Sequence, residues 1–161
     1  MKAAFAPIAS KISTVLILGT MPGERSIKLN QYYGHKGNQF WRLMFDIFEQ
    51  PFTDDYADRI ALLTKNKIAL WDVLSHCERE GSADSKIKNE IPNNLKLFYR
   101  KHPTIKHVFF ASKEAEKLYK KHVGQFNKHA YYVLPSPSGA NASKTYSVKL
   151  NEWRVILRIL A

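Results

Sequence analysis

STVLILG (residues 13–19) is a short apolar stretch that contains β-branched residues and ends in a glycine. Apolar runs of this length, without polar alternation, are typical of strands that a parallel sheet buries on both faces. Three later stretches have the same form: KIALWDV (67–73), KHVFFAS (106–112) and AYYVLPS (130–136). The sequence therefore predicts a central sheet of four parallel strands.

The segments between these strands have the spacing of amphipathic helices. Apolar residues recur at helical intervals in the segments 40–48 and 115–119, and again in 148–160. Strands that alternate with helices favour right-handed crossovers that cover both faces of a sheet. We expect an α/β fold of three α/β/α layers and one domain over residues 1–161, because no repeat or linker interrupts the chain.

The composition is that of a globular protein without disulfides. No run of about 18 apolar residues is present to span a bilayer. The segment MKAAFAPIASK lacks the apolar region of a signal peptide and Cys77 is the only cysteine, so we expect a cytoplasmic protein. The lone cysteine and the scattered histidines argue against an iron–sulfur cluster or a zinc site, and we expect no metal or other cofactor.

The charge balance favours a polyanionic partner. Twenty-five Lys and Arg residues against 14 Asp and Glu residues give a formal net charge of +11. Lys and Arg neutralise nucleic-acid phosphates whatever the base sequence, so a nucleic acid is the expected ligand. A generally basic surface without such a ligand is the alternative. A membrane surface is less favoured, because no basic helix with an uninterrupted apolar face is apparent.

Ligands of such sheets bind beyond the carboxyl ends of the strands. Four segments follow the predicted strands, and we expect them to converge: GTMPGERS (19–26), WDVLSHCEREGS (71–82), ASKEA (111–115) and LPSPSGANAS (134–143). The first lacks the Lys and the Ser or Thr that a nucleotide-hydrolysing phosphate loop requires. The last combines prolines with small residues, and its low surface and free backbone N–H groups would let a phosphate backbone approach closely.

The segment QYYGHKGNQFW (31–41) is too polar for a core and too aromatic for an ordinary loop. Flat rings beside amide groups suit a nucleobase, which needs stacking and hydrogen bonds at its edge. Phe40 and Trp41 begin the predicted helix and are expected in the core.

Taken in order, GTMPGERS, YYGHKGNQFW and LPSPSGANAS resemble the uracil-DNA glycosylase superfamily, and most of all its hypoxanthine (deoxyinosine) DNA glycosylase branch. WDVLSHCEREGSADSKI is similar to the middle segment of that branch, so the resemblance covers nearly the whole chain. It implies a monomeric DNA repair enzyme without cofactors. Such an enzyme hydrolyses the N-glycosidic bond of a deaminated base in double- or single-stranded DNA, here hypoxanthine first, then uracil or xanthine.

The resemblance also assigns the central residues of the site. Tyr33 is the expected platform for the flipped base, since an aromatic residue stands there in the mismatch-specific branch, and Tyr32 is expected to assist. Met21 stands where that branch has the Asn that positions the attacking water, and a thioether holds water poorly. Asn38 is therefore the expected catalytic residue, as the hypoxanthine branch uses an Asn in this segment. Asn38 could instead only cap the helix that begins at Gln39.

The remaining candidate residues form two groups. The base-binding group includes Ser112, which with Ala111 replaces the Asn-Gly pair of the hypoxanthine branch, and Ser136, which stands where other branches have His or Asn. Thr20 and Met21 complete that group. The residues expected to contact the DNA itself are His35, Lys113, Ser138, Gly139 and Asn141.

Two other functions remain open. One is a G:U/T mismatch-specific uracil or thymine glycosylase, and the other is a non-catalytic DNA-binding relative that lost water activation at Met21. Asp72, Glu78 and Arg79 could form an acid–base set, but no second carboxylate at a fixed distance can be identified from the spacing. Asp72 is expected to organise the neighbouring loop. No lysine stands clearly where it would form a Schiff base with the sugar, so lyase activity is not expected.

Overall fold

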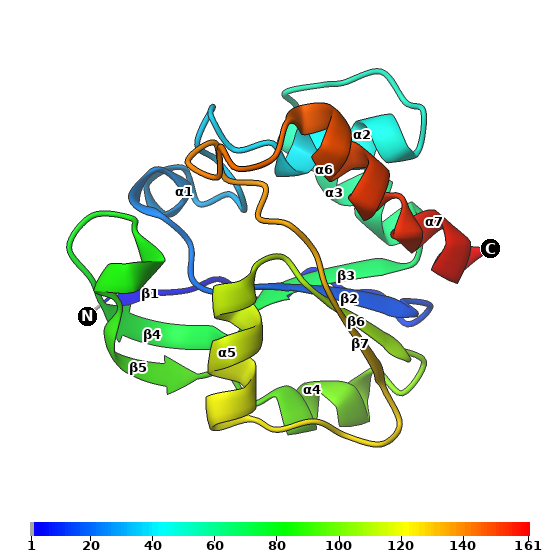
Figure 1. Cartoon of the computed structure of the whole chain (residues 1–161). Coiled ribbons are helices and arrows are strands. Elements are labelled where there is room, and N and C mark those ends of the chain that lie inside the picture. Colours follow the sequence, from blue (N-terminus) through cyan, green and yellow to red (C-terminus); the bar gives the residue numbers. More distant parts are fainter. Residues whose placement is uncertain (1) are drawn as a thin grey trace.

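Four parallel strands form the centre of the computed structural model, which describes residues 2–161 (Figure 1). Met1, which belongs to the expected domain, lies outside the described residues. The strand order is β3-β2-β6-β7, so β2 lies between β3 and β6. The predicted sheet is confirmed, and its strands are β2 (Val15–Gly19), β3 (Ile68–Asp72), β6 (His107–Phe110) and β7 (Ala130–Val133).

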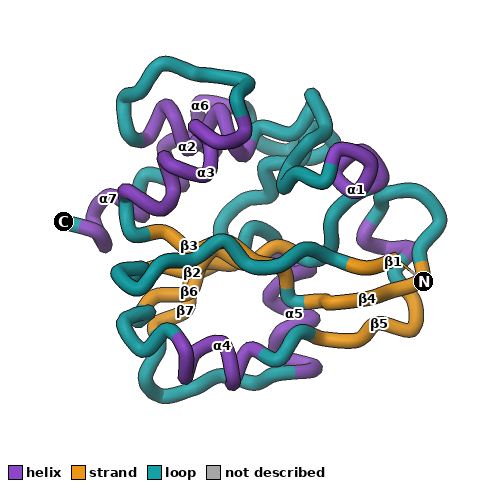
Figure 2. Tube along the Cα trace, turned by 180° about the vertical axis from the view of Figure 1, so that it is seen from behind, coloured by secondary structure: helices purple, strands orange, loops and turns teal. Residues whose placement is uncertain are grey.

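Strand β2 is buried on both faces, which explains its unbroken apolar sequence. Val15 and Ile17 belong to one cluster of the core, whereas Leu16 and Leu18 belong to the other, and none of the four is exposed. Successive side chains of a strand point to opposite faces, so each face needs its own covering layer. Figure 2 shows helices on both sides of the sheet.

The layer over Val15 and Ile17 contains the aromatic residues that the sequence assigned to the core. Phe40 is fully buried and Trp41 nearly so, and both pack in the same cluster as Trp153. The helices of this layer are α2 (Phe40–Ile47), α3 (Tyr56–Lys65), α6 (Tyr146–Trp153) and α7 (Val155–Leu160).

The helix expected over residues 148–160 is divided at Arg154. There the N–H of Leu157 bonds to the carbonyl of Arg154, three residues earlier, at 3.0 Å. Such a bond tightens the turn and separates α6 from α7. The apolar spacing alone, which continues through the break, gave no sign of it.

The opposite layer consists of α4 (Leu95–Lys101) and α5 (Lys113–His122). Both helices begin at a capping side chain: Asn94 accepts a hydrogen bond from the N–H of Leu97, and Ser112 accepts one from the N–H of Ala115. Such caps satisfy N–H groups that the first helical turn leaves free. None of the helices within residues 2–161 is long and apolar enough to cross a membrane.

A second, antiparallel sheet lies beside the first and was not predicted. It consists of β1 (Lys2–Ala3), β4 (Leu74–Glu78) and β5 (Lys88–Pro92) in the order β1-β4-β5. Part of segment 71–82, expected as a loop, is therefore strand. Only Leu74 and Cys77 of β4 are fully buried, so the strand lacks the apolar run that marked the others. A short helix α1 (Glu24–Leu29) follows β2, and a 3-10 turn η1 (Asp84–Lys86) precedes β5.

Candidate functional site

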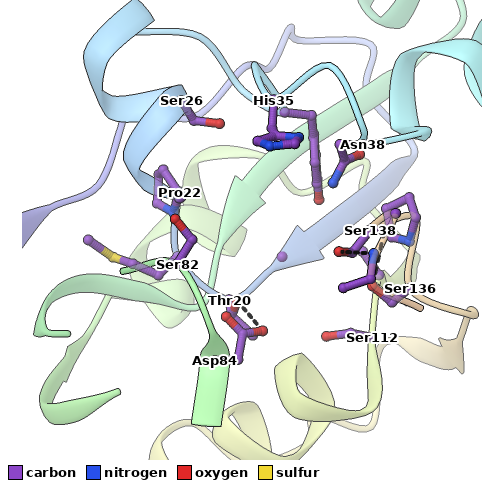
Figure 3. A pocket seen from close by; sticks show the side chains of 18 of the residues that line it. Thr20, Pro22, Ser26, His35, Asn38, Ser82, Asp84, Ser112, Ser136 and Ser138 are labelled. Atoms are coloured by element: carbon purple, nitrogen blue, oxygen red, sulfur yellow. Dashed lines mark hydrogen bonds between the residues drawn. The ribbon is translucent and has the colours of Figure 1, made fainter. Parts of the chain in front are cut away.

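A cavity of about 910 Å³ opens at the carboxyl ends of the central strands. Figure 3 shows side chains of distant segments directed toward this common space. Besides Asp72 at the end of β3, the lining residues come from the segments 19–26, 32–38, 82–84, 111–112 and 136–141.

The cavity gathers nearly all residues that the sequence assigned to the site. Lys113 is the exception, because it is the exposed first residue of α5 and does not line the cavity. The predicted residues that do line it are Thr20, Met21, Tyr32, Tyr33, His35, Asn38, Ser112, Ser136, Ser138, Gly139 and Asn141.

The ring of Tyr33 packs against Phe40 on one face, and its hydroxyl lies close to Gly19. Its ring stacks on Phe40 with centroids 4.1 Å apart and planes inclined by 23°. Its φ of 53° is a left-handed conformation that is costly for a bulky residue and is therefore imposed by the surroundings. The hydroxyl lies 3.0 Å from the point that a Cβ on Gly19 would occupy. The bare Cα of Gly19 thus leaves room for the tip of the ring.

Asn38 caps the start of α2 and also faces the cavity. Its Oδ1 accepts a hydrogen bond of 2.9 Å from the N–H of Phe40, the first residue of α2; the N-cap residue is Gln39, so Asn38 satisfies this N–H from one position before the cap. A carbonyl oxygen has two lone pairs, which leaves Oδ1 a second acceptor position, and Nδ2 carries two further donors. In Figure 3, Asn38 and Ser138 lie on one side of the cavity and Pro22 and Ser82 on the other. Capping and contact with a ligand are therefore compatible.

His35 stands exposed at the rim of the cavity. Its Nδ1 accepts a hydrogen bond of 2.9 Å from the N–H of Gly37. A ring nitrogen that accepts carries no proton, so in the neutral ring the proton is on Nε2. His35 can therefore donate outward from Nε2 to an anionic group.

The loop after β7 is folded by its own small side chains. The hydroxyls of Ser136 and Ser138 accept hydrogen bonds from the N–H groups of Ser138 and Ala140, each at 3.2 Å. The side-chain amide of Asn141 donates to the carbonyl of Ser136 at 3.2 Å. Several backbone N–H groups expected to be free are thus used within the loop. The donors left for a ligand include the hydroxyl hydrogens of Ser136 and Ser138 and the second hydrogen of the Asn141 amide.

This loop packs against the loop before α2 through backbone atoms. The N–H of Gln39 donates to the carbonyl of Pro137 at 2.7 Å. A Cβ on Gly139 would lie 2.6 Å from the carbonyl oxygen of Gly37, so only glycine allows this approach. We call the segments 35–39 and 136–141 together the backbone wall.

Lys149 of α6 lies behind the backbone wall and joins its two segments. Its side chain is buried, and Nζ donates to Oε1 of Gln39 at 2.9 Å and to the carbonyl of Ser138 at 3.2 Å. Burial lowers the pKa of this lysine. On the same helix, the indole of Trp153 donates to the carbonyl of Pro135 at 2.9 Å. Helix α6 thus fixes the loop that follows β7.

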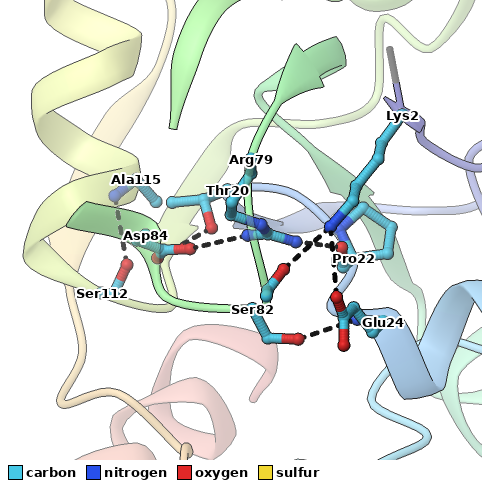
Figure 4. Close-up of polar contacts among 10 residues, drawn as sticks. Lys2, Thr20, Pro22, Glu24, Arg79, Ser82, Asp84, Ser112 and Ala115 are labelled. Atoms are coloured by element: carbon cyan, nitrogen blue, oxygen red, sulfur yellow. Dashed lines mark hydrogen bonds and ion pairs between the residues drawn. The ribbon is translucent and has the colours of Figure 1, made fainter. Parts of the chain in front are cut away.

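The opposite side of the cavity is joined by charged and polar side chains (Figure 4). The side chain of Arg79 is fully buried, and its guanidinium donates to the carbonyl of Pro22 and lies 3.3 Å from Oδ1 of Asp84. The other carboxylate oxygen of Asp84 accepts a bond of 2.9 Å from the hydroxyl of Thr20. Segment 79–84 is therefore tied to the loop after β2 at two points.

Two further contacts extend this connection. The hydroxyl of Ser82 accepts a bond of 2.9 Å from the N–H of Glu24, the first residue of α1. Lys2 donates to the carbonyl of Gly81 at 2.9 Å and pairs with Glu24 at 3.7 Å. We call the segments 20–24 and 79–84 together the side-chain wall.

Asp72 forms part of the cavity floor. It ends β3, is 5% exposed, and places Oδ1 2.6 Å from the point that a Cβ on Gly19 would occupy. Burial raises the pKa of Asp72 to about 7; the charge of Asp84 adds to this effect and Arg79 opposes it. Burial also raises the pKa of Asp84 and that of Tyr33. The floor therefore disfavours negative charge.

Three residues predicted to bind the base have partners within the protein. The hydroxyl of Tyr32 donates to the carbonyl of Ala6 at 2.7 Å, so this side chain anchors the turn. Thr20 is bonded to Asp84, and Ser112 serves as the cap of α5. The hydroxyl of Thr20 has given its hydrogen to Asp84 and can only accept a hydrogen bond from a ligand. The hydroxyl of Ser112 accepts from Ala115 and can still donate its hydrogen to a ligand.

The sequence did not identify the side-chain wall. Asp84 was not singled out, and Arg79 was considered only as part of an acid–base set with Asp72 and Glu78. Glu78 instead points away from the cavity floor and accepts a bond of 2.7 Å from Asn89 of β5. The available signal was an Arg and an Asp on either side of Gly81, a spacing that also occurs in solvated loops.

Residues 2–161 contain no group of three or more His, Cys, Asp or Glu side chains that could hold a metal ion.

Comparisons with known proteins agree on one family. A family model described as the uracil DNA glycosylase superfamily matches residues 7–158. A protein named hypoxanthine DNA glycosylase from Methanosarcina barkeri (strain Fusaro / DSM 804) is 38% identical over 149 residues, which cover 92% of this chain and 93% of that protein. A protein of the same name from Methanosarcina acetivorans is 35% identical over 161 residues and covers 98% of both chains.

A solved structure has the same fold. It is a solution NMR structure of a Methanosarcina acetivorans protein that bears the name uracil DNA glycosylase. It superposes with a TM-score of 0.83 at 34% identity and covers 99% of this chain and 98% of its own.

Proposed function

Because the chain belongs to the uracil DNA glycosylase superfamily, we propose that it is a DNA repair enzyme that hydrolyses the N-glycosidic bond of deaminated bases flipped out of DNA. The observation that carries this proposal is the cavity, which gathers an aromatic platform, a side-chain amide and a loop of small residues from distant parts of the sequence. An everted nucleotide needs each of these parts. The proposal includes that the protein is a monomer, forms a single domain and acts on DNA in the cytoplasm.

The reaction sets the requirements on the site. The sugar becomes oxocarbenium-like as the bond breaks, and negative charge develops on the departing base. The enzyme must therefore hold the base flat, bind its polar edge and align a water molecule with the sugar carbon.

Tyr33 is the platform in this proposal. Phe40 covers one face of its ring, so the other face is left for a base in the cavity. Stacking on an aromatic side chain contributes about 1–3 kcal/mol per base. Because Tyr33 is already held by Phe40, little further ordering is needed when the base arrives.

Asn38 is the catalytic residue in this proposal, since Met21 cannot hold the water by a strong hydrogen bond. Met21 is buried with apolar residues and shapes the pocket without polar contact. The free lone pair of the Asn38 amide oxygen accepts from the water, and its Nδ2 group donates to the sugar or the base. Such a preorganised polar group commonly contributes a factor of about 10²–10³ to the rate.

The backbone wall is the DNA-facing side in this proposal. Ser138, Gly139 and Asn141 present a low surface with hydroxyl and amide groups, and His35 offers an outward N–H. Phosphate contacts of this kind position the DNA without reading its sequence. Lys113, outside the cavity, adds only long-range attraction.

For the base, we propose hypoxanthine first and uracil second. Both Methanosarcina relatives are named hypoxanthine DNA glycosylase. Ser136 and Ser112 offer hydroxyl hydrogens to the edge of the base, whereas Thr20, whose hydrogen goes to Asp84, offers only a lone pair. In this proposal the leaving base is stabilised by hydrogen bonds and not by a side-chain charge.

The test uses duplex oligonucleotides that carry one deoxyinosine, deoxyuridine or deoxyxanthosine, with matched undamaged duplexes as controls. After incubation, alkali cleaves the strand at any abasic site. We expect cleavage of the deoxyinosine duplex first and none of the undamaged one. Uracil removal confined to G:U pairs would favour a mismatch-specific enzyme. No cleavage of any duplex, with DNA binding retained, would replace the enzyme with a non-catalytic DNA-binding protein.

A further inference from the structure

A buried lysine of α6, Lys149, has no carboxylate partner. It is 2% exposed, and none of the ion pairs within residues 2–161 includes it. Glu152 of the same helix pairs with Lys144, and Asp46 of α2 accepts a bond from Tyr146. Lysine is almost never fully buried unless it is paired, because a charge is costly to remove from water. A buried ammonium group without an ion pair therefore calls for another role.

The ammonium group bonds instead to two uncharged oxygen atoms on separate segments. Nζ of Lys149 donates to Oε1 of Gln39 at 2.9 Å and to the carbonyl of Ser138 at 3.2 Å. An ammonium group carries three donors on one nitrogen, so it serves both acceptors at once, and a charged donor forms stronger bonds than a neutral one. Lys149 does not line the cavity, so both bonds are made from behind the backbone wall.

The side chain of Gln39 is available to Lys149 because Asn38 satisfies the start of α2. Gln39 is the N-cap residue, but its side chain forms no capping bond. Oδ1 of Asn38 accepts from the N–H of Phe40 in its place. The ammonium group thus holds the side chain of the residue that directly follows Asn38.

The bond to Ser138 joins the same lysine to the loop after β7. One residue earlier, the carbonyl of Pro137 accepts from the backbone N–H of Gln39 at 2.7 Å. Two segments joined by one hydrogen bond can still rotate about it, whereas a second connection away from the first restrains that rotation. Lys149 supplies this second connection.

We propose that Lys149 is a positioning residue for the reaction: its buried ammonium group, bonded to Gln39 and Ser138 at once, fixes the amide of Asn38 relative to the loop that contacts the DNA. This inference rests on the proposed function for the purpose of Asn38, but not for the bonds themselves. A misplacement of about 1 Å in a reacting group can cost a factor of about 10² in rate. Loss of the ammonium group should therefore slow the reaction more than it weakens DNA binding.

The first test compares Lys149→Met, an unbranched side chain without a donor, with Trp153→Phe. The latter is the matched control, because it removes a bond from the same helix to the same loop, at the carbonyl of Pro135, and leaves Gln39 untouched. Single-turnover cleavage of a deoxyinosine duplex is measured at saturating protein, beside the Kd for that duplex.

We expect Lys149→Met to lower the saturated rate by about 10-fold or more and to raise the Kd by no more than about 3-fold, as for the loss of one positive charge. Trp153→Phe should keep the rate within about 3-fold of the native value. A native rate in Lys149→Met, or an equal loss in both variants, would overturn the proposal.

The second test asks whether Lys149 acts through Gln39. Gln39→Glu keeps an oxygen that accepts from Nζ, whereas Gln39→Met has none. We expect Gln39→Glu to stay within about 3-fold of the native saturated rate and Gln39→Met to lose about 5-fold or more. Gln39 is only half-buried, so this pair of variants decides the matter even if Lys149→Met does not fold.

The double variant of Lys149→Met and Gln39→Met should be no slower than Lys149→Met alone, because residues that act through one contact are not additive. Additive losses would contradict the connection. So would a Gln39→Glu variant as slow as Gln39→Met.

The third test needs no activity, so it separates this inference from the proposed function. Hydrogen exchange of the Gln39 N–H, which bonds to Pro137, is followed by NMR in the free protein beside that of the Ile17 N–H in β2. In Lys149→Met, exchange at Gln39 should accelerate by about 10-fold or more beyond any change at Ile17, because the two segments separate locally. In Trp153→Phe the two N–H groups should change alike.

Unchanged exchange at Gln39 in Lys149→Met would overturn the inference even in an active enzyme. The expected exchange in a protein that cleaves no duplex would overturn only the proposed function.

Discussion

The side-chain wall and the backbone wall border one cavity, yet different kinds of contact hold them. In the side-chain wall, the guanidinium of Arg79 and the carboxylate of Asp84 join segment 79–84 to the loop after β2. In the backbone wall, the N–H of Gln39 meets the carbonyl of Pro137, and Gly139 lies against Gly37. Removing charged atoms should therefore break the first wall, whereas the close backbone approach of the second should be broken by adding atoms at Gly139.

The walls also differ in charge. The side-chain wall contains the carboxylate that helps raise the pKa of Asp72 and the cation that opposes it. The backbone wall has one buried cation behind it, Lys149, whose acceptors are an amide oxygen and a carbonyl, both uncharged. An approaching phosphate therefore meets uncompensated positive charge on this side. This difference supports the proposal that one wall sets the chemistry of the floor and the other receives the DNA.

The largest effect is expected at Asn38 in the backbone wall. Asn38→Ala should lower the single-turnover rate on a deoxyinosine duplex by about 10²-fold or more, because a preorganised polar group is lost. DNA binding should change little, since the phosphate contacts lie elsewhere in the wall. The measurement is single-turnover cleavage beside equilibrium binding of the same duplex.

Asn38→Asp separates catalysis from capping. Aspartate retains the oxygen that accepts from the N–H of Phe40 and loses the amide donors. If Asn38 only caps α2, Asn38→Asp should restore the native rate. If the Nδ2 donors of Asn38 take part in catalysis, the rate should stay low while the thermal midpoint returns toward the native value.

Arg79→Met should reveal the dependence of the side-chain wall on a single cation. It leaves Asp84 without its partner in a largely buried position, and breaking such a pair lowers the free energy of unfolding by about 2–4 kcal/mol. Urea unfolding measures the change. Lys120→Met is the matched control, because Lys120 pairs with Glu116 on the surface of α5 and should matter by less than about 1 kcal/mol. Equal effects in the two variants would contradict the distinction between the walls.

The sequence predicted both the central sheet and the convergence of the loops that follow its strands, and both predictions have the same physical reason. Parallel strands buried on both faces need unbroken apolar runs, and such runs place the segments that follow them at one edge. Strand β4 gave no such signal, because its outward residues are polar. The side-chain wall depends on Thr20 and Asp84, which are 64 residues apart. No local pattern links them, so only the fold reveals the contact.

Gly139→Ala tests whether the backbone wall tolerates added atoms. The new Cβ would lie 2.6 Å from the carbonyl oxygen of Gly37, and separating the two segments would strain the bond between the N–H of Gln39 and the carbonyl of Pro137, next to Asn38. We expect the free energy of unfolding to fall by about 1–2 kcal/mol and the cleavage rate to fall with it. Gly23→Ala is the counterpart in the side-chain wall. Its Cβ would meet the hydroxyl of Ser82 at 3.1 Å, and this side chain can rotate away at the cost of its bond from the N–H of Glu24, so the effect should be smaller.

The smallest effect is expected from Lys113→Ala, outside both walls. Lys113 begins α5 directly after Ser112 of the cavity and is exposed, so it can attract DNA only through solvent. We expect the Kd for a deoxyinosine duplex and for an undamaged duplex to rise equally, by about 2- to 3-fold, and the slope of log Kd against log salt to fall by less than about 1. The control is Lys65→Ala, since Lys65 ends α3 and the chain then enters β3 at the opposite end of the sheet. If Lys65→Ala weakened binding as much as Lys113→Ala, DNA would be held by overall charge, and the backbone wall would lose its place as the DNA-facing side.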